Sequence, residues 1–194
     1  TARSHTQINH FEDFLARAKA EPGKLTYASP GHGTSTQMAA DAMAAAAAIS
    51  IEEVPYQGGG PALTALLSGV VDTALATPSI VMPQVKAGKL VALAVTGEQR
   101  FAPSRDVPTM VEKGVDVAVV ARYGFYMPRG TPAEIVSQFS EAVEYAVKDT
   151  HYVDLMRDSY NEIEFLAPAA YEKAMQDEDT YFTTLMQKMG MKMK

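Results

Sequence analysis

The sequence of 194 residues contains no cysteine and no tryptophan, and it has only four histidines. Without cysteine the chain cannot form a disulfide, a thiolate metal site or a cysteine nucleophile. The histidines stand at positions 5, 10, 32 and 151, and no two of them show the spacing of paired metal ligands with an intervening acid. We therefore expect neither a metal ion nor a cofactor.

Positive charge and long apolar runs are scarce as well. The sequence has 17 Lys and Arg against 23 Asp and Glu, which gives a net charge of −6. Because no basic stripe is present to displace counterions from phosphates, nucleic acid is not an expected partner. The longest apolar run, residues 43–49, is mostly alanine and too short to cross a bilayer, and no signal-peptide pattern opens the sequence. An anionic ligand would have to be held by local dipoles, because the overall charge repels it.

Short β-like runs alternate with helical runs over the first 120 residues, a pattern typical of an α/β domain with a mainly parallel sheet. Strands are expected at residues 24–28, 51–54, 72–76 and 90–96. The last of these runs is almost wholly apolar, which predicts a central strand. Helices are expected at residues 11–20, from Thr34 or Ser35 onwards, at 61–68 and at 77–88.

The last third of the sequence is expected to hold further strands and three helices. Residues 115–127 and 163–166 have β-like composition. Residues 131–134, Thr-Pro-Ala-Glu, have the pattern of a capping box with proline in the first helical position. A shorter helix is expected at residues 152–158, and Pro168 is expected to open the last one.

A glycine-rich turn between the first parallel strand and its helix is the most informative local feature. It comprises Ser29, Pro30, Gly31, His32, Gly33, Thr34 and Ser35. Glycines allow the backbone to approach a ligand closely, and the amides of a first helical turn have no partner within the helix. Such a turn can bind an anion without a basic side chain. A tight turn with a good helix cap, and no ligand, is the alternative.

A second helix start is expected close to this turn. If residues 24–28 form the first of three parallel strands in the order 2-1-3, ligands bind between the loops that follow the first and third strands. The second of these loops contains Thr77, Pro78 and Ser79. Two helix N-termini would then face one crevice, an arrangement that suits a carboxylate. The loop at residues 56–60 follows the second strand, and we interpret it as structural.

Catalytic and nucleotide-binding patterns are incomplete. Ser29 resembles a nucleophile elbow only loosely, because Ala28 takes the place of the leading glycine. A Walker loop would need a lysine after Gly33, and the dinucleotide fingerprint would need a glycine at Thr36. Glu52 and Glu53 lie at the distance of a ribose-binding acid, but the acid pairs are interpreted as solvated faces.

Six segments, in order, resemble one known family. Residues 22–34 (PGKLTYASPGHGT), 54–63 (VPYQGGGPAL), 67–72 (LSGVVD), 86–96 (KAGKLVALAVT), 107–114 (VPTMVEKG) and 128–132 (PRGTP) are similar to segments of the Bug/TctC solute receptors. These are the binding proteins of tripartite tricarboxylate transporters. The family's opening strand and its proline- and glycine-rich loop have no counterpart in these residues, and Arg122-Tyr123-Gly124 stands where the family has Trp-Gly.

The resemblance implies a Venus-flytrap fold of the periplasmic-binding-protein type II, with mainly parallel α/β lobes. Residues 1–121 would form a nearly complete second lobe, and residues 122–194 the C-terminal part of an incomplete first lobe. The family's second ligand loop falls on Ser29, Gly31, His32, Gly33, Thr34 and Ser35. The implied function is periplasmic capture of a di- or tricarboxylate or related organic acid for the membrane subunits of a transporter, without enzymatic activity and without direct membrane insertion.

Two other functions stay open from the sequence. The first is a cytoplasmic effector-sensing domain of a regulator, because regulators use similar two-lobed folds. The second is a serine hydrolase built on Ser29.

Overall fold

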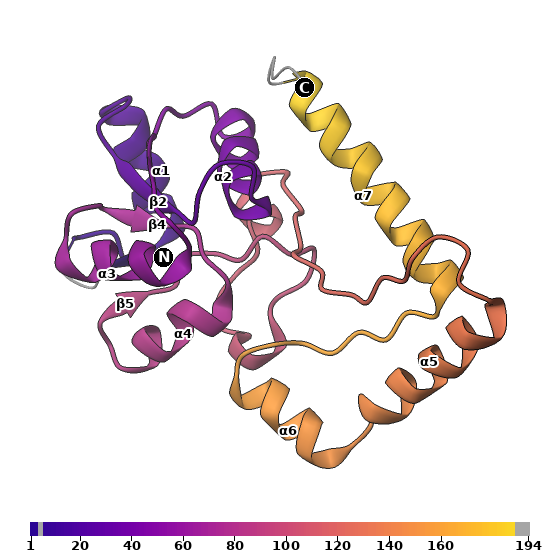
Figure 1. The fold of residues 1–194 in the computed structure, drawn as a ribbon. Coiled ribbons are helices and arrows are strands. Elements are labelled where there is room, and N and C mark those ends of the chain that lie inside the picture. The colour runs from indigo at the N-terminus through magenta and orange to yellow at the C-terminus, as the bar shows by residue number, and fades with distance from the viewer. Residues whose placement is uncertain (4–5, 189–194) are drawn as a thin grey trace. The chain divides into compact units, whose positions relative to one another are not determined.

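The computed structural model describes residues 1–3 and 6–188 (Figure 1). The chain divides into two compact units, Thr1–Arg122 and Tyr123–Lys194, and each is described by itself. The first unit is an α/β domain, and the second consists of helices joined by extended segments.

A five-stranded mixed sheet forms the centre of the first unit. Its strands are β1 (Ala2–Arg3), β2 (Thr26–Ser29), β3 (Glu52–Pro55), β4 (Thr73–Ala74) and β5 (Leu90–Val91), in the order β3-β2-β4-β1-β5. β2 pairs in parallel with β3 and with β4, which confirms the expected 2-1-3 order. β1 pairs antiparallel with β4 and β5, and the sequence patterns gave no sign of it.

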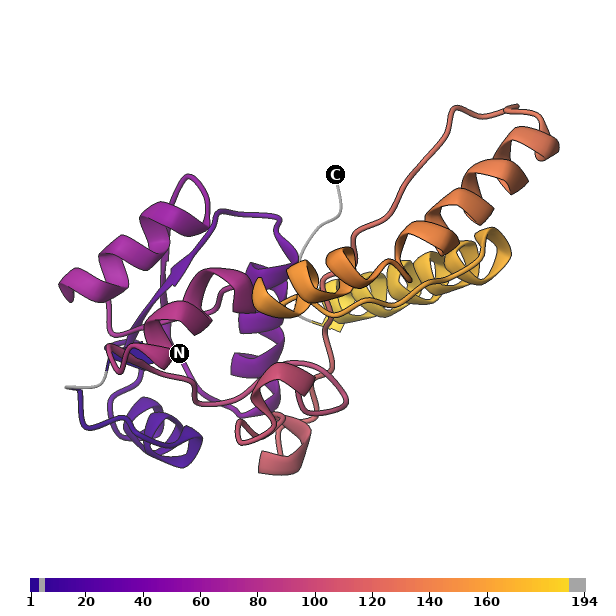
Figure 2. The ribbon, with the colours of Figure 1, turned by 90° about the horizontal axis from the view of Figure 1, so that it is seen from below.

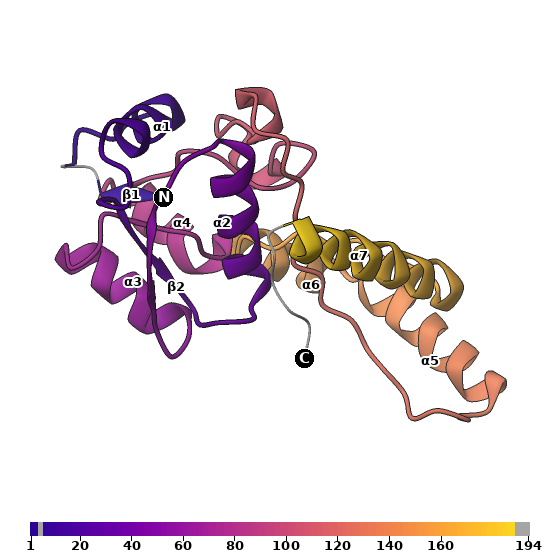
Figure 3. The same ribbon diagram turned by 90° about the horizontal axis from the view of Figure 1, so that it is seen from above.

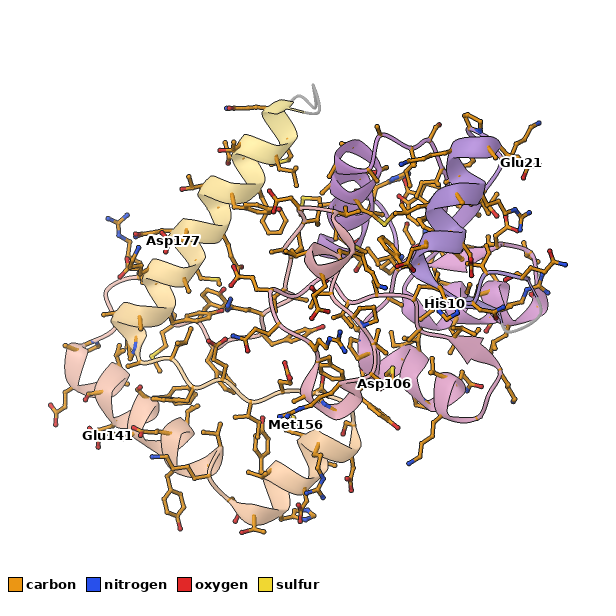
Figure 4. All side chains as sticks on the ribbon, turned by 180° about the vertical axis from the view of Figure 1, so that it is seen from behind. His10, Glu21, Asp106, Glu141, Met156 and Asp177 are labelled. Atoms are coloured by element: carbon orange, nitrogen blue, oxygen red, sulfur yellow. The ribbon has the colours of Figure 1, made fainter. Side chains whose placement is uncertain are left out.

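Four α-helices cover this sheet: α1 (Phe11–Ala20), α2 (Ser35–Ala46), α3 (Gly59–Ser68) and α4 (Pro78–Lys86). Helices α1 and α3 lie on opposite faces of the sheet (Figures 2 and 3). His10 and Glu21 flank α1 (Figure 4), and the Asp13 carboxylate accepts the backbone N–H of His10 at 2.9 Å. Helix α3 begins at Gly59, two residues before the expected start at Pro61.

Side chains of β2 alternate between the two faces of the sheet, as the pleat requires. Ala28 packs with Leu66 of α3, Val81 of α4 and Leu90 in one buried cluster. Tyr27 points to the other face and is 4% exposed. The sheet is therefore covered on both sides, which fixes the directions in which the side chains at the ends of its strands point.

Two strand predictions in this unit are wrong. Only Leu90–Val91 of residues 90–96 form a strand, and it is an edge strand because β1 separates it from the parallel strands. Residues 115–127 form no strand, although Val115, Val117 and Val119 are buried alternately. Among the described residues, the backbone of Val119 forms hydrogen bonds only with Thr96. The alternating pattern therefore reflects burial of an extended segment that does not pair with a strand.

Two single-turn 3₁₀ helices complete the first unit, at Ala102–Ser104 and Val111–Lys113. They lie in the polar, proline-containing part of the chain that follows β5. Lys113 of the second helix forms an ion pair with Glu12 at 2.6 Å, which links this region to α1.

The second unit contains α5 (Ala133–Ala146), α6 (Thr150–Asp158) and α7 (Pro168–Lys188), shown in orange to yellow in Figure 2. No residue of 123–187 is buried. The strand expected at residues 163–166 is absent, because this segment is extended without a partner strand among the described residues. The capping box at Thr131 is also absent: α5 starts one residue later, and the Thr131 hydroxyl donates to the Pro128 carbonyl instead. None of the described helices combines the length and apolar character needed to span a bilayer.

Candidate functional site

The turn between β2 and α2 has the conformation that its glycines predict. Gly31 and Gly33 have φ values of 125° and 76°, which side chains rarely adopt. A Cβ added to Gly31 would lie 3.3 Å from the Tyr56 carbonyl oxygen, so glycine is also needed for space. Tyr56 N–H donates to the Ser29 carbonyl and Gly58 N–H donates to the Pro30 carbonyl, at 3.0 and 3.1 Å. The loop at residues 56–58 is thus fastened to the turn.

Several polar groups of the turn are already engaged within the protein. Ser29 Oγ accepts the Gly31 N–H at 3.2 Å, and Gln37 Oε1 accepts the Gly33 N–H at 3.0 Å. The Thr34 hydroxyl caps α2 by accepting the Gln37 N–H, and it donates to the Gly31 carbonyl at 2.9 Å. These groups shape the turn and are engaged within the protein, so they are not free to bind a ligand.

Four residues on either side of Gly33 retain unbonded amides. Among the described residues, the backbone N–H groups of His32, Thr34, Ser35 and Thr36 have no hydrogen-bond partner. They belong to the turn and to the first turn of α2, whose N-terminus carries the positive end of the helix dipole. His32 and Gly33 are exposed, so solvent reaches this part of the backbone. The turn therefore presents a group of amide donors, without a basic side chain, to an anion.

The start of α4 lies at the same edge of the sheet. Because β2 and β4 are parallel neighbours, the segments that leave their carboxyl ends emerge together. Thr77 is the N-cap residue of α4, and Pro78 occupies the first helical position. The Ser79 N–H has no partner among the described residues, and its hydroxyl lies 3.4 Å from that of Thr77. Both predicted helix starts lie at one edge of the sheet.

The carboxylate of Glu53 lies directly behind the turn. Glu53 Oε1 accepts the Ser29 hydroxyl at 2.5 Å, and Glu53 Oε2 lies 3.2 Å from Nδ1 of His32. The Glu53 side chain is only 18% exposed, so interpreting it as a solvated face was wrong. Glu52 and Glu53 are consecutive on a strand, so their side chains point to opposite faces of the sheet. Glu52 is exposed, whereas Glu53 is largely covered.

The contacts of Ser29 do not form a catalytic triad. A triad needs the histidine between the serine and the acid, so that the imidazole receives the serine proton. Here the carboxylate of Glu53 lies between Ser29 and His32. Ser29 is also fully buried, and its hydroxyl both donates to Glu53 and accepts from Gly31. Ser29 is a supporting residue of the turn.

A second polar group extends from the turn into the protein. Gln37, which holds the Gly33 amide, donates from Nε2 to Asp41 Oδ2 at 2.6 Å. Burial, and then the charge of Glu53, raise the pKa of Asp41. Burial, and then the charges of Asp41 and Glu53, raise the pKa of the Tyr27 phenol well above its usual range. The surroundings of the turn are therefore acidic.

The loop at residues 56–60, which was interpreted as structural, packs closely against the turn. It lies against the turn through the bonds of Tyr56 and Gly58, and it leads directly into α3. The N–H groups of Gly59 and Gly60 have no partner among the described residues. The three consecutive glycines before Pro61 were the available sequence signal. This edge of the sheet carries three helix starts, and ligand binding was predicted at two of them.

Two surface pockets lie away from this edge. The first is lined by Arg3, Leu67, Gly88 and Lys89. The second lies near the 3₁₀ segments and is lined by ten residues that include His10, Arg100 and Lys113. Neither contains a predicted site residue, and the described residues hold no group of three or more acids or histidines placed to bind a metal ion.

An α/β sheet whose helix N-termini present unbonded amides at the carboxyl edge of parallel strands is typical of a domain that binds small molecules. The chain belongs to a particular family of such proteins. Residues 1–191 match the family described as "Tripartite tricarboxylate transporter family receptor". The Bug/TctC resemblance of the six segments is thereby confirmed.

Curated relatives agree with this assignment. A UPF0065 protein from the gbd 5′ region of Cupriavidus necator is 34% identical over 145 residues, which cover 75% of this chain and 44% of the relative. Protein BugT of Bordetella pertussis is 27% identical over 76% of this chain and 46% of its own length. The chain thus spans less than half the length of these two relatives.

Solved structures share the fold. A TctC solute-binding protein from Polaromonas has a TM-score of 0.81 at 26% identity, covering 96% of this chain and 64% of its own. MatC from Rhodopseudomonas palustris, solved with bound malate, has a TM-score of 0.79 at 25% identity over 95% of this chain and 64% of its own. Rpa4515 of R. palustris, solved with adipate, has a TM-score of 0.89 at 23% identity, and the match covers 97% of this chain and 64% of Rpa4515. The expected α/β fold of the periplasmic-binding-protein type is confirmed.

Proposed function

We propose that this protein captures a small dicarboxylate or tricarboxylate and binds one carboxylate group with the unbonded amides at the carboxyl edge of β2 and β4. The observation that carries this proposal is the group of N–H donors at His32, Thr34, Ser35 and Thr36, which have no partner among the described residues, at the same edge of the sheet as the start of α4 at Ser79. Two structural neighbours were solved with the dicarboxylates adipate and malate, which supports this class of ligand.

Peptide amides can supply enough free energy for this task. A hydrogen bond from a backbone N–H to a charged carboxylate contributes about 1.5–3 kcal/mol when it is shielded from water. Two or three such bonds, with the dipole of α2 behind them, would outweigh the repulsion from a chain of net charge −6. Within the predicted set, we assign ligand contact to the backbone of His32, Thr34, Ser35 and Ser79, and a supporting role to Ser29, Gly31, Gly33, Thr77 and Pro78.

Family membership also supports a proposal for the lobe organisation, the compartment and the partner of this protein. We propose that residues 1–121 form a nearly complete second lobe and that residues 122–194 belong to the first. The boundary between the two compact units, after Arg122, supports this division. The protein would act in the periplasm, without catalysis, and would deliver its ligand to membrane subunits of a tripartite transporter.

Neither alternative function has an observation in its favour. The Ser29 hydroxyl is buried and faces a carboxylate, which is unfavourable for a nucleophile. The described residues show no feature that is specific to an effector-sensing regulator.

A ligand panel on the whole protein tests the proposal. Malate, adipate and citrate are compared with neutral analogues of the same length in thermal-shift and calorimetric titrations. We expect at least one di- or tricarboxylate to raise the melting temperature and the neutral analogues to have no effect, because only the former present a charge to the amides. Stabilisation by neutral analogues alone, or by nothing in an extended panel of organic anions, would contradict the proposal.

A further inference from the structure

His32 is the side chain of the turn that is most accessible to a ligand. Its side chain is 73% exposed, whereas that of its partner Glu53 is 18% exposed. A carboxylate can only accept hydrogen bonds, so the contact of 3.2 Å between Glu53 Oε2 and His32 Nδ1 places a proton on Nδ1. The other carboxylate oxygen is occupied by the Ser29 hydroxyl, which holds Glu53 in place.

This contact determines what the other ring nitrogen can do. In neutral imidazole only one nitrogen carries a proton, so a histidine that donates from Nδ1 has a lone pair on Nε2. A lone pair repels a carboxylate. A second proton turns Nε2 into a donor and gives the ring a positive charge. The same side chain is therefore unfavourable to an anion in one protonation state and favourable in the other.

The charges that face His32 make this difference important. Glu53 on β3 pairs with it directly, Asp41 on α2 interacts with it electrostatically, and Tyr27 on β2 is a phenol kept neutral by burial. Among the described residues, no lysine or arginine forms an ion pair with Asp41 or Glu53. His32 is the available source of positive charge beside the free amides in this part of the chain.

Building on the proposed function, we propose that His32 couples carboxylate capture to the uptake of one proton. A proton from solvent adds to Nε2 of His32 as the anion binds, and Nδ1–H stays on Glu53. The imidazolium then offsets the acidic surroundings, and Nε2–H donates to the ligand carboxylate next to the amides of the turn. Binding is strongest in mildly acidic solution and weakens as the pH rises.

Calorimetric titration of malate and adipate into the whole protein tests this coupling. The titrations are run between about pH 6 and pH 8.5 in two buffers of different ionisation enthalpy, which together report proton uptake. We expect a net uptake of up to one proton per ligand and a dissociation constant that rises with pH by at most about tenfold per pH unit. His32→Gln should abolish the uptake and flatten the pH profile. His151→Gln, an exposed histidine of α6, should retain both.

The variant Asp41→Asn tests whether Asp41, rather than His32, takes up the proton. The variant should still take up a proton on binding, because that proton goes to the imidazole. Uptake that persists in His32→Gln, or a pH-independent affinity of the wild-type protein, would overturn the coupling and leave the proposed function standing. Absence of binding by both ligands and by the wider panel of organic anions would overturn both.

A measurement without ligand gives an independent readout. ¹⁵N NMR of the imidazole of the free protein, with His32→Gln for assignment, identifies which nitrogen is protonated in the neutral form. We expect the Nδ1–H tautomer in the wild-type protein. An Nε2–H tautomer would show that Glu53 does not accept from His32, and it would overturn the proposal independently of any ligand.

Discussion

Ser29 illustrates how a single buried hydroxyl determines the form of the turn. It donates to Glu53 and accepts from Gly31, so it joins the end of β2 to β3 and to the turn itself. The sequence alone predicted the turn, because strand, glycines and helix cap follow one another along the chain. It did not predict that Ser29 and Gln37 would occupy two of the amides, since that depends on which side chains are buried there.

Removing the Ser29 hydroxyl should therefore destabilise the protein. In Ser29→Ala the Glu53 carboxylate loses a donor and the Gly31 amide loses its acceptor, and we expect a loss of about 1.5–3 kcal/mol in the free energy of unfolding. Urea denaturation measures it. The matched control is Ser50→Ala, at an exposed serine whose side chain has no hydrogen bond to any described residue, and it should stay within about 0.5 kcal/mol of wild type. An equal effect of both substitutions would contradict the role of Ser29.

Asp41 should make stability depend on pH in a defined direction. Its pKa is raised in the folded state, first by burial, so its contribution to stability is present at low pH and is lost as the pH rises through the folded pKa. Asp41→Asn should then be more stable than wild type at pH 7, by less than about 1 kcal/mol because the group is partly exposed. The advantage should vanish below about pH 4.

Denaturation at the two pH values checks this prediction. Asp116→Asn, at an exposed carboxylate, serves as control and should change stability equally little at both. If Asp41→Asn were less stable than wild type at pH 7, the ionised Asp41 carboxylate would stabilise the fold, which would contradict the prediction.

At the scale of elements, the helices were predicted better than the strands. Helix α1 was predicted to the residue, because its apolar positions recur every three or four residues and Pro22-Gly23 ends it. Residues 90–96 are almost wholly apolar, and buried and less buried side chains alternate along residues 115–119. Both patterns indicate burial, but neither specifies a partner strand. The pairing of β1 between β4 and β5 joins residues about seventy to ninety positions apart. No local pattern contains that information.

The two helix starts at the site differ in how they are capped, and this difference can be measured. The Thr34 side chain accepts the Gln37 amide, whereas the Thr77 side chain caps nothing. Thr34→Ala should lower the free energy of unfolding by about 1 kcal/mol, within the range of 0.5–2 found for N-caps. Thr77→Ala should cost less than about 0.5 kcal/mol. Similar losses at both positions would contradict the assignment of Thr34 as a cap.

At the scale of the whole molecule, the buried core belongs to one unit. All the buried side chains of the described chain lie between residues 2 and 119, and none lies in residues 123–187. The second unit instead exposes aromatic residues such as Tyr123, Phe125 and Tyr126 at 70% or more. Helix propensity alone rarely stabilises short helices in water without burial of an apolar face.

The two units should consequently behave differently when they are separated. A fragment of residues 1–122 should unfold cooperatively in urea and keep dispersed NMR signals, because it holds the complete sheet and core. A fragment of residues 123–194 should show little helix by circular dichroism and no cooperative transition. A stable, cooperative second fragment would contradict the account of where the core lies.

The central claim is that backbone amides bind the carboxylate, and amide NMR during titration of the whole protein with malate or adipate tests it most directly. The account predicts that the N–H signals of His32, Thr34, Ser35, Thr36 and Ser79 shift together with increasing ligand. The amides of Gly23, before β2, and of Glu52, at the start of β3, are bonded within the protein at the opposite edge of the sheet. Their N–H signals should shift little. Saturable binding that leaves all five site amides unshifted would contradict the account.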